Sequence, residues 1–430
     1  MKVVHVSVSD KLPGAHLAGY QLHQGLLRIG IDSTMFVARR LDDSGDETIR
    51  VYRPPKDFPS RVKRFGYRHW IEHELDRNRR RDSWASFTYD RTAEGRCSVS
   101  QIPPADVIYM HSAAGFIDYS RDLPSLAQRA PIVRVLHDMN FFTGGCTHDR
   151  GCGRFTDHCG ACPLLRSSCE DDLSRRVWVR KHNVFTRIRG RLHIVAPSRW
   201  IAGEARRSSL LRDLPVEVIP NAVDTEAFRR QNKAAMRDLC GLPREARVVG
   251  FLSNPLDRTV KGFPLLLEAM AALKDTPNLF LLTGGGGRPP KEIGVPHLHL
   301  GCIHDTRMLC AFYSAADIVV IPSRNDNLPS VAMEAMACGA PVVAFAVGGI
   351  PDMVRHGVTG LLVPPDRTDL LRQSIAELLD DTSARARMAD NSVKIAETEY
   401  SLPVHARRHA DFCARILSLA KGATMRVSLP

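Results

Sequence analysis

Short apolar runs rich in β-branched residues alternate with amphipathic stretches along almost the whole chain. VVHVSV is followed by HLAGYQLHQGLLRIG, and then STMFVA, DVIYM, PIVRVL and HIVAPS follow in turn. The alternation restarts with RVVGFL and continues through LFLLTG, DIVVIPS, APVVAF and TGLLVPP. Strands that alternate with helices form parallel sheets covered by helices. The pattern therefore predicts an α/β protein with two doubly wound, Rossmann-like domains.

The two series of strands meet at VEVIPNAVDTEAF, where Pro220 and Asn221 mark a turn. We expect an N-terminal domain of residues 1–222 and a C-terminal domain of residues 223–398. A helix within residues 399–430 is expected to pack back on the first domain. The 430 residues suffice for two domains, since single cores stop growing at roughly 250–300 residues. Ligands of such sheets bind outside the carboxyl ends of the strands, which predicts a ligand cleft between the domains.

The opening residues, the apolar runs and the cysteine count indicate in which cellular compartment the protein is expected. The opening MKVVHVSVSD is β-prone and meets a charge at Asp10, unlike a signal peptide. No uncharged run approaches the roughly 18 residues of a membrane span. We therefore expect a cytoplasmic protein. The eleven cysteines are an odd number, and a reducing compartment argues against a disulfide framework.

Positive charge is concentrated in one segment. The formal net charge is +12, and residues 50–81 contain eleven Lys or Arg against four Asp or Glu, together with Phe65, Tyr67 and Trp70. Basic residues gain about 1 kcal/mol each near an anionic membrane, and aromatic residues favour its interface. One reading is peripheral contact with the inner face of the plasma membrane, in which we expect Arg79, Arg80 and Arg81 to take part. The other is a solvated basic helix. No motif supports nucleic-acid binding.

The most informative stretch runs from Ser323 to Pro365. A buried strand ends at Pro322 and Ser323, the polar loop RNDNLP follows, and a helix is expected to start near Ser330 with Glu334 in its first turn. Free N–H groups at a helix N-terminus make a site for a diphosphate. Asp326 and Glu334 could reach two parts of one ligand, because carboxylates bind sugar and ribose hydroxyls well. Alternatively, Glu334 only complements the helix dipole.

This stretch resembles the donor-binding signature of the retaining glycosyltransferases of family four, which have the GT-B fold. LPSVAMEAMACGAPVVAF and GGIPDMV…GVTGLLVPP stand in the family's order and spacing. The resemblance implies that Asp326 holds the donor sugar and Glu334 the ribose. It also implies donor contacts in the loop and the following turn, from Asn327, Leu328, Pro329, Ser330 and Gly349. The family has Glu where this chain has Asp326, which is one methylene shorter.

Two further stretches of the second half resemble the family. In NPLDRTVKGFPLLLEAM, Lys261 matches a lysine that grips the donor diphosphate, although it could also be a solvated lysine at a helix start. Asn254 stands where the family has an arginine, and Arg258 is a weak substitute for it. LTGGGG resembles the glycine turn near the nucleotide, where Gly285 would allow close backbone approach, or it is only a flexible turn.

The first half contributes four candidate residues. Gly14 and Ala15 resemble the glycine loop that opens the family's first domain. His137 ends a buried strand at a position where the family has a functional histidine, which implies a hydrogen bond to the donor sugar. His111 also ends a strand and is either an acceptor-side residue or a packing residue.

Four cysteines are gathered in GGCTHDRGCGRFTDHCGACPLL, directly after His137. Cys146, Cys152, Cys159 and Cys162 are consistent with a structural zinc site, with His148, His158 and Cys169 in reserve. Unligated thiols and a redox-active disulfide are the alternatives. The arrangement resembles that of exopolysaccharide glycosyltransferases of the colanic-acid type. A catalytic metal is not expected, since four thiolates leave no open position.

Together these features predict a retaining glycosyltransferase. It would move a hexose-type sugar from a nucleoside diphosphate to a glycan or lipid-linked glycan, in exopolysaccharide or cell-surface polysaccharide synthesis. Catalysis is expected from His137, Lys261, Asp326 and Glu334, with no catalytic cofactor. The alternatives are a nucleotide-sugar epimerase or hydrolase on the same fold, and a non-catalytic glycan-binding scaffold.

Overall fold

The computed structural model describes residues 1–41, 45–78, 86–94, 96–256, 258–290 and 292–427. The chain divides into two compact units. Unit 1 joins residues 1–220 to the residues from His405 onward, and unit 2 runs from Asn221 to Val404. The first division lies two residues before the boundary expected at 222, and the second lies inside the C-terminal helix α14, Leu402–Val427.

Unit 1 is built on a seven-stranded parallel sheet in the order β3-β2-β1-β4-β5-β6-β7. Its strands are β1 Lys2–Ser9, β2 Asp32–Arg39, β3 Ile49–Val51, β4 Val107–Met110, β5 Ile132–Val135, β6 Leu192–Ala196 and β7 Val216–Val218. The described helices are α1 Ala15–Arg28, α2 Phe58–Asn78, α3 Arg96–Gln101, α4 Tyr119–Arg129, α5 Leu173–Ile188, α6 Arg199–Arg207 and most of α14. Short 3₁₀ turns occupy Asn140–Phe142, Arg154–Thr156, Pro163–Leu165 and Arg189–Arg191.

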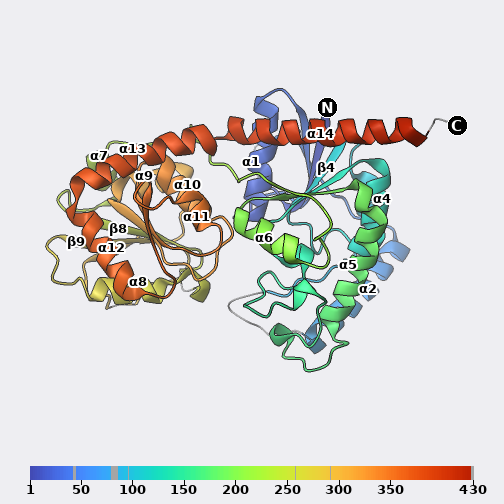
Figure 1. Ribbon diagram of the computed structural model, residues 1–430, viewed down its shortest axis with the longest axis horizontal. Coiled ribbons are helices and arrows are strands. Elements are labelled where there is room, and N and C mark those ends of the chain that lie inside the picture. The colour runs from blue at the N-terminus through green and yellow to red at the C-terminus, as the bar shows by residue number, and fades with distance from the viewer. Residues whose placement is uncertain (42–44, 79–85, 95, 257, 291, 428–430) are drawn as a thin grey trace. The chain divides into compact units, whose positions relative to one another are not determined.

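Both faces of this sheet are buried, which explains why its strands read as continuous apolar runs. Alternate residues enter two cores: Val4, Val6 and Met110 face one, and Val3 and Tyr109 face the other. The second core is closed by α14, which runs past α1 and β4 in Figure 1 and contributes Ala406, Phe412, Cys413 and Ile416.

Unit 2 is built on a six-stranded parallel sheet in the order β10-β9-β8-β11-β12-β13. Its strands are β8 Arg247–Leu252, β9 Leu279–Gly284, β10 His297–His299, β11 Ile318–Ile321, β12 Val342–Phe345 and β13 Gly360–Val363. Its helices are α7 Lys233–Cys240, the 3₁₀ turn Thr259–Lys261, α8 Phe263–Ala271, α9 Thr306–Ala315, α10 Ser330–Ala337, α11 Ile350–Met353, α12 Thr368–Asp380 and α13 Thr382–Glu399.

In each sheet the strand order reverses beside its first strand. In unit 1 the reversal lies between β1 and β4, and in unit 2 between β8 and β11. The loops after the two strands at such a point lead to opposite faces of the sheet and leave a crevice at its carboxyl edge. The doubly wound α/β prediction is confirmed for both units, and each crevice is a natural position for a ligand.

Candidate functional site

Two predicted residues meet at the carboxyl edge of unit 2, where the strand order reverses. Lys261 lies in the connection after β8, and Asp326 lies in the loop after β11. The Lys261 Nζ and the Asp326 Oδ2 are 2.5 Å apart, and their side chains are 27% and 13% exposed. The Ser323 hydroxyl donates a second hydrogen bond to the same carboxylate oxygen, at 3.2 Å. A cation and an anion therefore stand together at this crevice.

Glycines without room for a side chain hold this pair in place. A Cβ on Gly262 would lie 1.8 Å from the carbonyl oxygen of Pro322, so the turn after Lys261 packs directly on the end of β11. A Cβ on Gly348 would lie 1.8 Å from the carbonyl oxygen of Asp326. The next residue, Gly349, donates its N–H to that oxygen at 3.1 Å. The conformation of the Asp326 loop thus depends on glycine in two neighbouring turns.

The helix α10 begins at Ser330, as predicted, but Glu334 is its fifth residue. The expectation that Glu334 lies in the first turn is therefore wrong: that turn carries no acidic residue. No side chain caps the helix at Pro329, so its first N–H groups have no side-chain acceptor there. The side chains of Asn327, Leu328 and Pro329 are buried, whereas Ser330 is exposed.

Glu334 lies in the interior beside α9. Its Oε2 accepts a hydrogen bond of 2.6 Å from the Tyr313 hydroxyl. Burial raises the pKa of Glu334, and the hydrogen bonds from Tyr313 and Ser330 act in the opposite direction. Nothing in the sequence around Tyr313 pointed to this role, because a tyrosine on an apolar helix reads as a core residue.

The glycine turn after β9 packs against the end of β8. A Cβ on Gly285 would lie 1.6 Å from the carbonyl oxygen of Ser253. Asn254, which stands where an arginine was expected, accepts the N–H of Gly286 with its side-chain oxygen at 3.2 Å. Asn254 therefore holds the shape of the turn. The arginine nearest to position 254 along the chain is Arg258, and its side chain is exposed.

In unit 1, His137 and His111 are brought together at the carboxyl edge. His137 follows β5, His111 follows β4, and the Nδ1 of His111 is 3.1 Å from the Nε2 of His137. His137 is partly exposed, whereas His111 is only 1% exposed. Of the two readings of His111, its burial favours the packing role. Gly14 precedes α1 with a φ of 87°, and Ala15 is the first residue of that helix.

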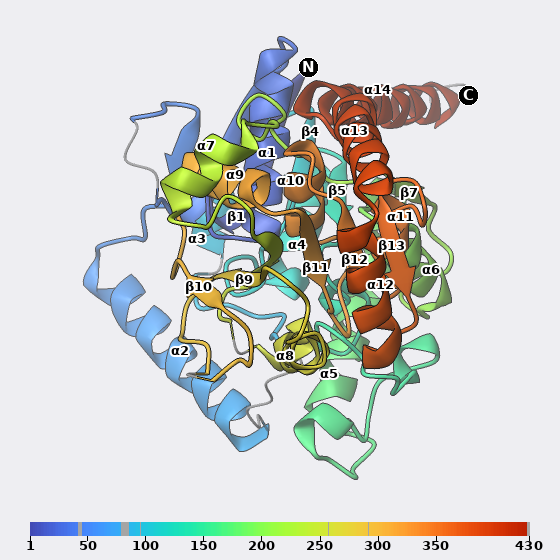
Figure 2. The same ribbon diagram turned by 90° about the vertical axis from the view of Figure 1, so that its left-hand side faces the viewer.

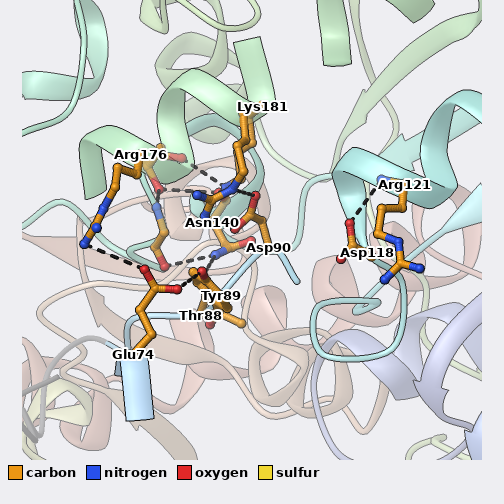
Figure 3. A network of polar contacts seen from close by, with 12 residues as sticks. Glu74, Thr88, Tyr89, Asp90, Asp118, Arg121, Asn140, Arg176 and Lys181 are labelled. Atoms are coloured by element: carbon orange, nitrogen blue, oxygen red, sulfur yellow. Dashed lines mark hydrogen bonds and ion pairs between the residues drawn. The ribbon is translucent and has the colours of Figure 1, made fainter. Parts of the chain in front are cut away.

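A network of polar contacts surrounds Asn140, three residues after His137, and includes Thr88 and Lys181 (Figure 3). The Asn140 N–H donates to Asp138 Oδ1, and the Asn140 amide donates to the carbonyl oxygens of Thr88 and Gly145. The buried ammonium of Lys181 donates to the carbonyl oxygens of Asn140 and Thr143. Burial lowers the pKa of Lys181 to about 8. The turn around Asn140 is thereby tied to α5.

The four predicted cysteines surround one small cavity of about 20 Å³. Cys159 and Cys162 are buried, and Cys146 and Cys152 are partly buried. Burial raises the pKa of Cys159 to about 12 and also raises that of Cys146 and Cys162, so these thiols are neutral near pH 7. Among the described residues, no three or more His, Cys, Asp or Glu side chains are placed to hold a metal ion. The structural zinc stays a prediction.

Comparison with known families gives a match in unit 2. Residues 246–381 match the model described as "Glycosyl transferases group 1". A D-inositol 3-phosphate glycosyltransferase of Corynebacterium glutamicum (strain R) is 35% identical over 202 residues, which are 43% of this chain and 48% of that protein. A protein of the same name from Thermobispora bispora is 34% identical over 214 residues. The alignments thus span about half the length of these relatives.

Comparison with solved structures covers both units. Sucrose-phosphate synthase from Thermosynechococcus elongatus has a TM-score of 0.64 at 18% identity, over 97% of this chain and all of that one. Anabaena Alr3699/HepE, solved in complex with UDP and glucose, has a TM-score of 0.61 at 18% identity, over 96% and 100%. At these identities the likeness concerns the fold. The chain therefore has the GT-B fold of two Rossmann-like units, and its residues 246–381 carry the sequence pattern of glycosyl transferases group 1.

Proposed function

We propose that the protein is a glycosyltransferase that takes its sugar from a nucleoside diphosphate donor. One observation carries the proposal: Lys261 and Asp326 are paired at the crevice of unit 2, beside the uncapped start of α10. The family match of residues 246–381 covers all three features. The names of the relatives, which are glycosyltransferases, support the reaction class.

The chemistry follows from where charge develops. When the sugar–oxygen bond breaks, negative charge grows on the leaving diphosphate. The Lys261 ammonium and the N–H groups at the start of α10 can stabilise that charge. Asp326 can accept hydrogen bonds from sugar hydroxyls, Ser323 can accept or donate them, and Glu334 can accept one from the ribose. His137 is proposed to hydrogen-bond the donor sugar from unit 1.

The finer parts of the proposal rest on the sequence pattern. They are retention of the anomeric configuration, a glycan or lipid-linked glycan acceptor, and a role in exopolysaccharide or cell-surface polysaccharide synthesis. With retention, the acceptor hydroxyl attacks on the face that the diphosphate leaves, and a diphosphate oxygen takes its proton. Analysis of the product by NMR, which reports the anomeric configuration directly, tests this point.

The decisive test exchanges Lys261 for methionine, which is an unbranched side chain only one atom shorter and carries no charge. We expect Lys261→Met to weaken the binding of UDP or GDP by about tenfold or more, as for the loss of a hydrogen bond to a charged group. Lys233→Met is the matched control. Lys233 also pairs with an aspartate, Asp317 at 2.8 Å, but this aspartate precedes β11 and so lies at the opposite edge of the sheet.

Titration calorimetry with UDP, GDP and their common sugar conjugates measures the affinity, and sugar release or transfer measures turnover. Equal affinities of Lys261→Met and the parent protein would remove Lys261 from the site. Product formed without any acceptor would favour the epimerase or hydrolase. Tight donor binding with no turnover on any glycan acceptor would favour the scaffold.

We also propose that unit 1 docks peripherally on an anionic membrane surface through α2. None of the helices in the described part of the chain is long and apolar enough to cross a bilayer. Phe58, Val62 and Phe65, spaced four and three residues apart on one face of α2, are 76%, 53% and 64% exposed. Figure 2 shows one long side of α2 with no ribbon against it. Such a stripe is the usual mark of an interaction surface.

The charges of α2 favour an anionic lipid surface as the occupant. Its first half carries Arg61, Lys63, Arg64 and Arg68 and no acidic residue, whereas Glu72, Glu74 and Asp76 follow in the second half. Basic residues that flank exposed aromatic rings suit a surface of anionic head groups above acyl chains. The predicted contribution of Arg79, Arg80 and Arg81 lies outside the described residues.

A further inference from the structure

Three histidines form a hydrogen-bonded row that leads from the interior of unit 1 to His137. The Nδ1 of His5, in the middle of β1, is 3.0 Å from the Nε2 of His111. The Nδ1 of His111 is 3.1 Å from the Nε2 of His137. Successive rings have centroids 5.3 and 5.4 Å apart and planes inclined by 20° and 32°. His137 is thus held through its Nε2 by a second histidine, which is held by a third.

The surroundings leave the row little freedom. A Cβ on Gly19 of α1 would lie 2.8 Å from the Cγ of His111, so the helix packs directly on that ring. The Arg134 guanidinium donates to the carbonyl oxygen of His111. Tyr109 stacks on His5 with centroids 5.2 Å apart, and its hydroxyl lies 2.9 Å from the Nδ1 of His409 on α14.

All three rings are neutral near pH 7. Burial lowers the pKa of His137 to about 3, and it lowers those of His5 and His111 well below the usual 6.5. A neutral imidazole has one N–H donor and one acceptor nitrogen. Each ring in the row can therefore donate at one nitrogen and accept at the other. Once the protonated nitrogen of one ring is fixed, the hydrogen bonds fix the protonated nitrogen of the other two rings.

His5, at the buried end of the row, determines in which direction the three rings donate their hydrogen bonds. The Nε2 of His5 is buried and has no hydrogen-bond partner among the described residues. A buried N–H without a partner is rarer than a buried acceptor without one, so the proton of His5 belongs on Nδ1. The His5 N–H then donates to His111 Nε2, and the His111 Nδ1–H donates to His137 Nε2.

We propose that His111 and His5 are positioning residues that fix His137 in its Nδ1–H tautomer and hold its ring in one plane. The consequence is that His137 presents an N–H donor, and not a lone pair, away from His111. Such a donor suits an oxygen of the sugar or of the leaving group. The contact with the sugar or the leaving group rests on the proposed function of His137, whereas the assignment of the tautomer does not rest on it.

The test measures the tautomer directly. In full-length protein labelled with ¹⁵N-histidine, long-range ¹H–¹⁵N correlation spectra distinguish Nδ1–H from Nε2–H rings, and His137→Gln identifies the His137 signals. We expect His5, His111 and His137 all to be Nδ1–H tautomers. In His111→Phe, which keeps a ring but has no nitrogen, His137 should show both tautomers. His111→Gln can still donate through its amide and should preserve the parent state of His137.

Turnover gives the second measurement. With His111→Phe, turnover should fall by at least about tenfold, because a catalytic imidazole in the wrong tautomer loses its function, and UDP or GDP affinity should change by less than twofold. His23→Phe is the matched control. His23 is equally buried, and both of its ring nitrogens are hydrogen-bonded outside the row, to Ser33 and Thr48. Its ring meets that of His5 only edge-on, with centroids 5.8 Å apart, so His23→Phe should leave the His137 tautomer unchanged.

The outcomes separate this inference from the proposed function. An Nε2–H signal for His137 in the parent protein, or an unchanged His137 tautomer in folded His111→Phe, would overturn it. If His111→Phe does not fold, His5→Phe and the parent spectrum decide the same question. A parent protein with the expected tautomers but no affinity for any nucleoside diphosphate would leave the row intact and contradict the proposed function.

Discussion

Glu334 places a carboxylate in the interior of unit 2 with Tyr313 as its hydroxyl partner. An ionised group in such a place costs stability, whereas the proposed hydrogen bond from a ribose hydroxyl is stronger to an ionised carboxylate than to a neutral acid. If Glu334 binds the ribose as proposed, stability and donor binding make opposite demands on this residue. This is a common feature of binding sites, where local rules of folding are broken for function.

The exchange Glu334→Gln should reveal this conflict. The folded-state pKa of Glu334 lies above that of the unfolded chain, so its stabilising contribution is present below about pH 4.5 and is lost as the pH rises through the folded-state pKa. Glutamine has no such titration. At pH 7 we expect the variant to unfold at a temperature equal to or above that of the parent, and to bind UDP or GDP about tenfold more weakly.

Thermal unfolding between pH 4 and pH 8 and calorimetric affinity measure the two effects. Glu268→Gln serves as the control, because the exposed Glu268 accepts a hydrogen bond from Thr368 away from the crevice. A variant that loses stability at pH 7 but keeps its affinity would show that Glu334 has only a structural role.

The candidate residues of unit 2 could be predicted because the motif brings them close along the chain. Asp326, Ser330 and Glu334 lie within one loop and one helix, and Lys261 matched a separate motif. The direct pairing of Lys261 with Asp326 could not be predicted, since it depends on how the Gly262 turn meets Pro322. The row of histidines was missed as well, although a histidine inside VVHVSV is a buried polar residue that needs a partner.

The exposed apolar stripe of α2, made of Phe58, Val62 and Phe65, is proposed to bind an anionic membrane, and this can be tested. Phe58→Ser combined with Phe65→Ser should reduce cosedimentation with vesicles that contain phosphatidylglycerol, because apolar burial and charge attraction act together. Binding of the parent should weaken as salt rises, since the attraction is screened. Affinity for UDP or GDP should not change.

Val179→Ser provides the control for this experiment, since Val179 is a 40% exposed apolar residue on α5 of the same unit. Vesicles of phosphatidylcholine alone show the part of binding that needs no charge. Equal sedimentation of the double variant and the parent at low salt would leave α2 as a solvated helix.

The cysteine loop, residues 144–165, is predicted to bind a structural zinc ion. The sequence pattern predicts about one zinc per chain. Four cysteines round one cavity support this, and the lack of a grouped ligand set among the described residues argues against it. We expect elemental analysis of untagged protein to find zinc. Cys159→Ser with Cys162→Ser should lose both metal and stability, because metal binding at such a site is folding energy.

Cys310→Ser with Cys338→Ser is the matched control, as these two buried cysteines of unit 2 have their sulfur atoms 3.6 Å apart. Metal binding requires thiolates, so zinc uptake should also release protons and strengthen with pH. Protein without zinc or iron, in which all eleven thiols titrate after unfolding, would exclude the metal.

The long strands and helices were predictable from their apolar periods, whereas the short edge strands were not. β3, β7 and β10 have three residues each, and β7 lies inside VEVIPNAVDTEAF, the stretch where the two series of strands were expected to meet. A strand of this length contributes too few side chains to show a period. Its pairing depends on a neighbouring strand that is already in place.

At the scale of the molecule, unit 1 is discontinuous and α14 completes it. Phe412 of this helix is 8% exposed and belongs to the core that contains Tyr109 and Val3. We expect Phe412→Ala to reduce the free energy of unfolding of unit 1 by about 3 kcal/mol, the lower end for loss of a buried phenyl ring. The two units should then unfold in two separate calorimetric transitions, and the one that belongs to unit 1 should move to lower temperature.

Leu419→Ala on the same helix is the control. Leu419 is 70% exposed, and its loss should change the free energy of unfolding by no more than about 0.5 kcal/mol. If the two variants were equally stable, the packing of α14 on β4 would contribute nothing, and the division of the chain at residue 404 would be wrong.

The position of α14 in the sequence has a consequence for synthesis on the ribosome. The first 220 residues emerge early but lack the residues from His405 onward that close one face of their sheet. Translation proceeds at roughly 5–20 residues per second, so that face stays uncovered for roughly 10–40 s while all of unit 2 is made. Unit 2 is continuous and can finish first, although it begins later. The nascent chain therefore offers a chaperone a defined apolar surface, centred on Tyr109 and Val3, until α14 leaves the exit tunnel.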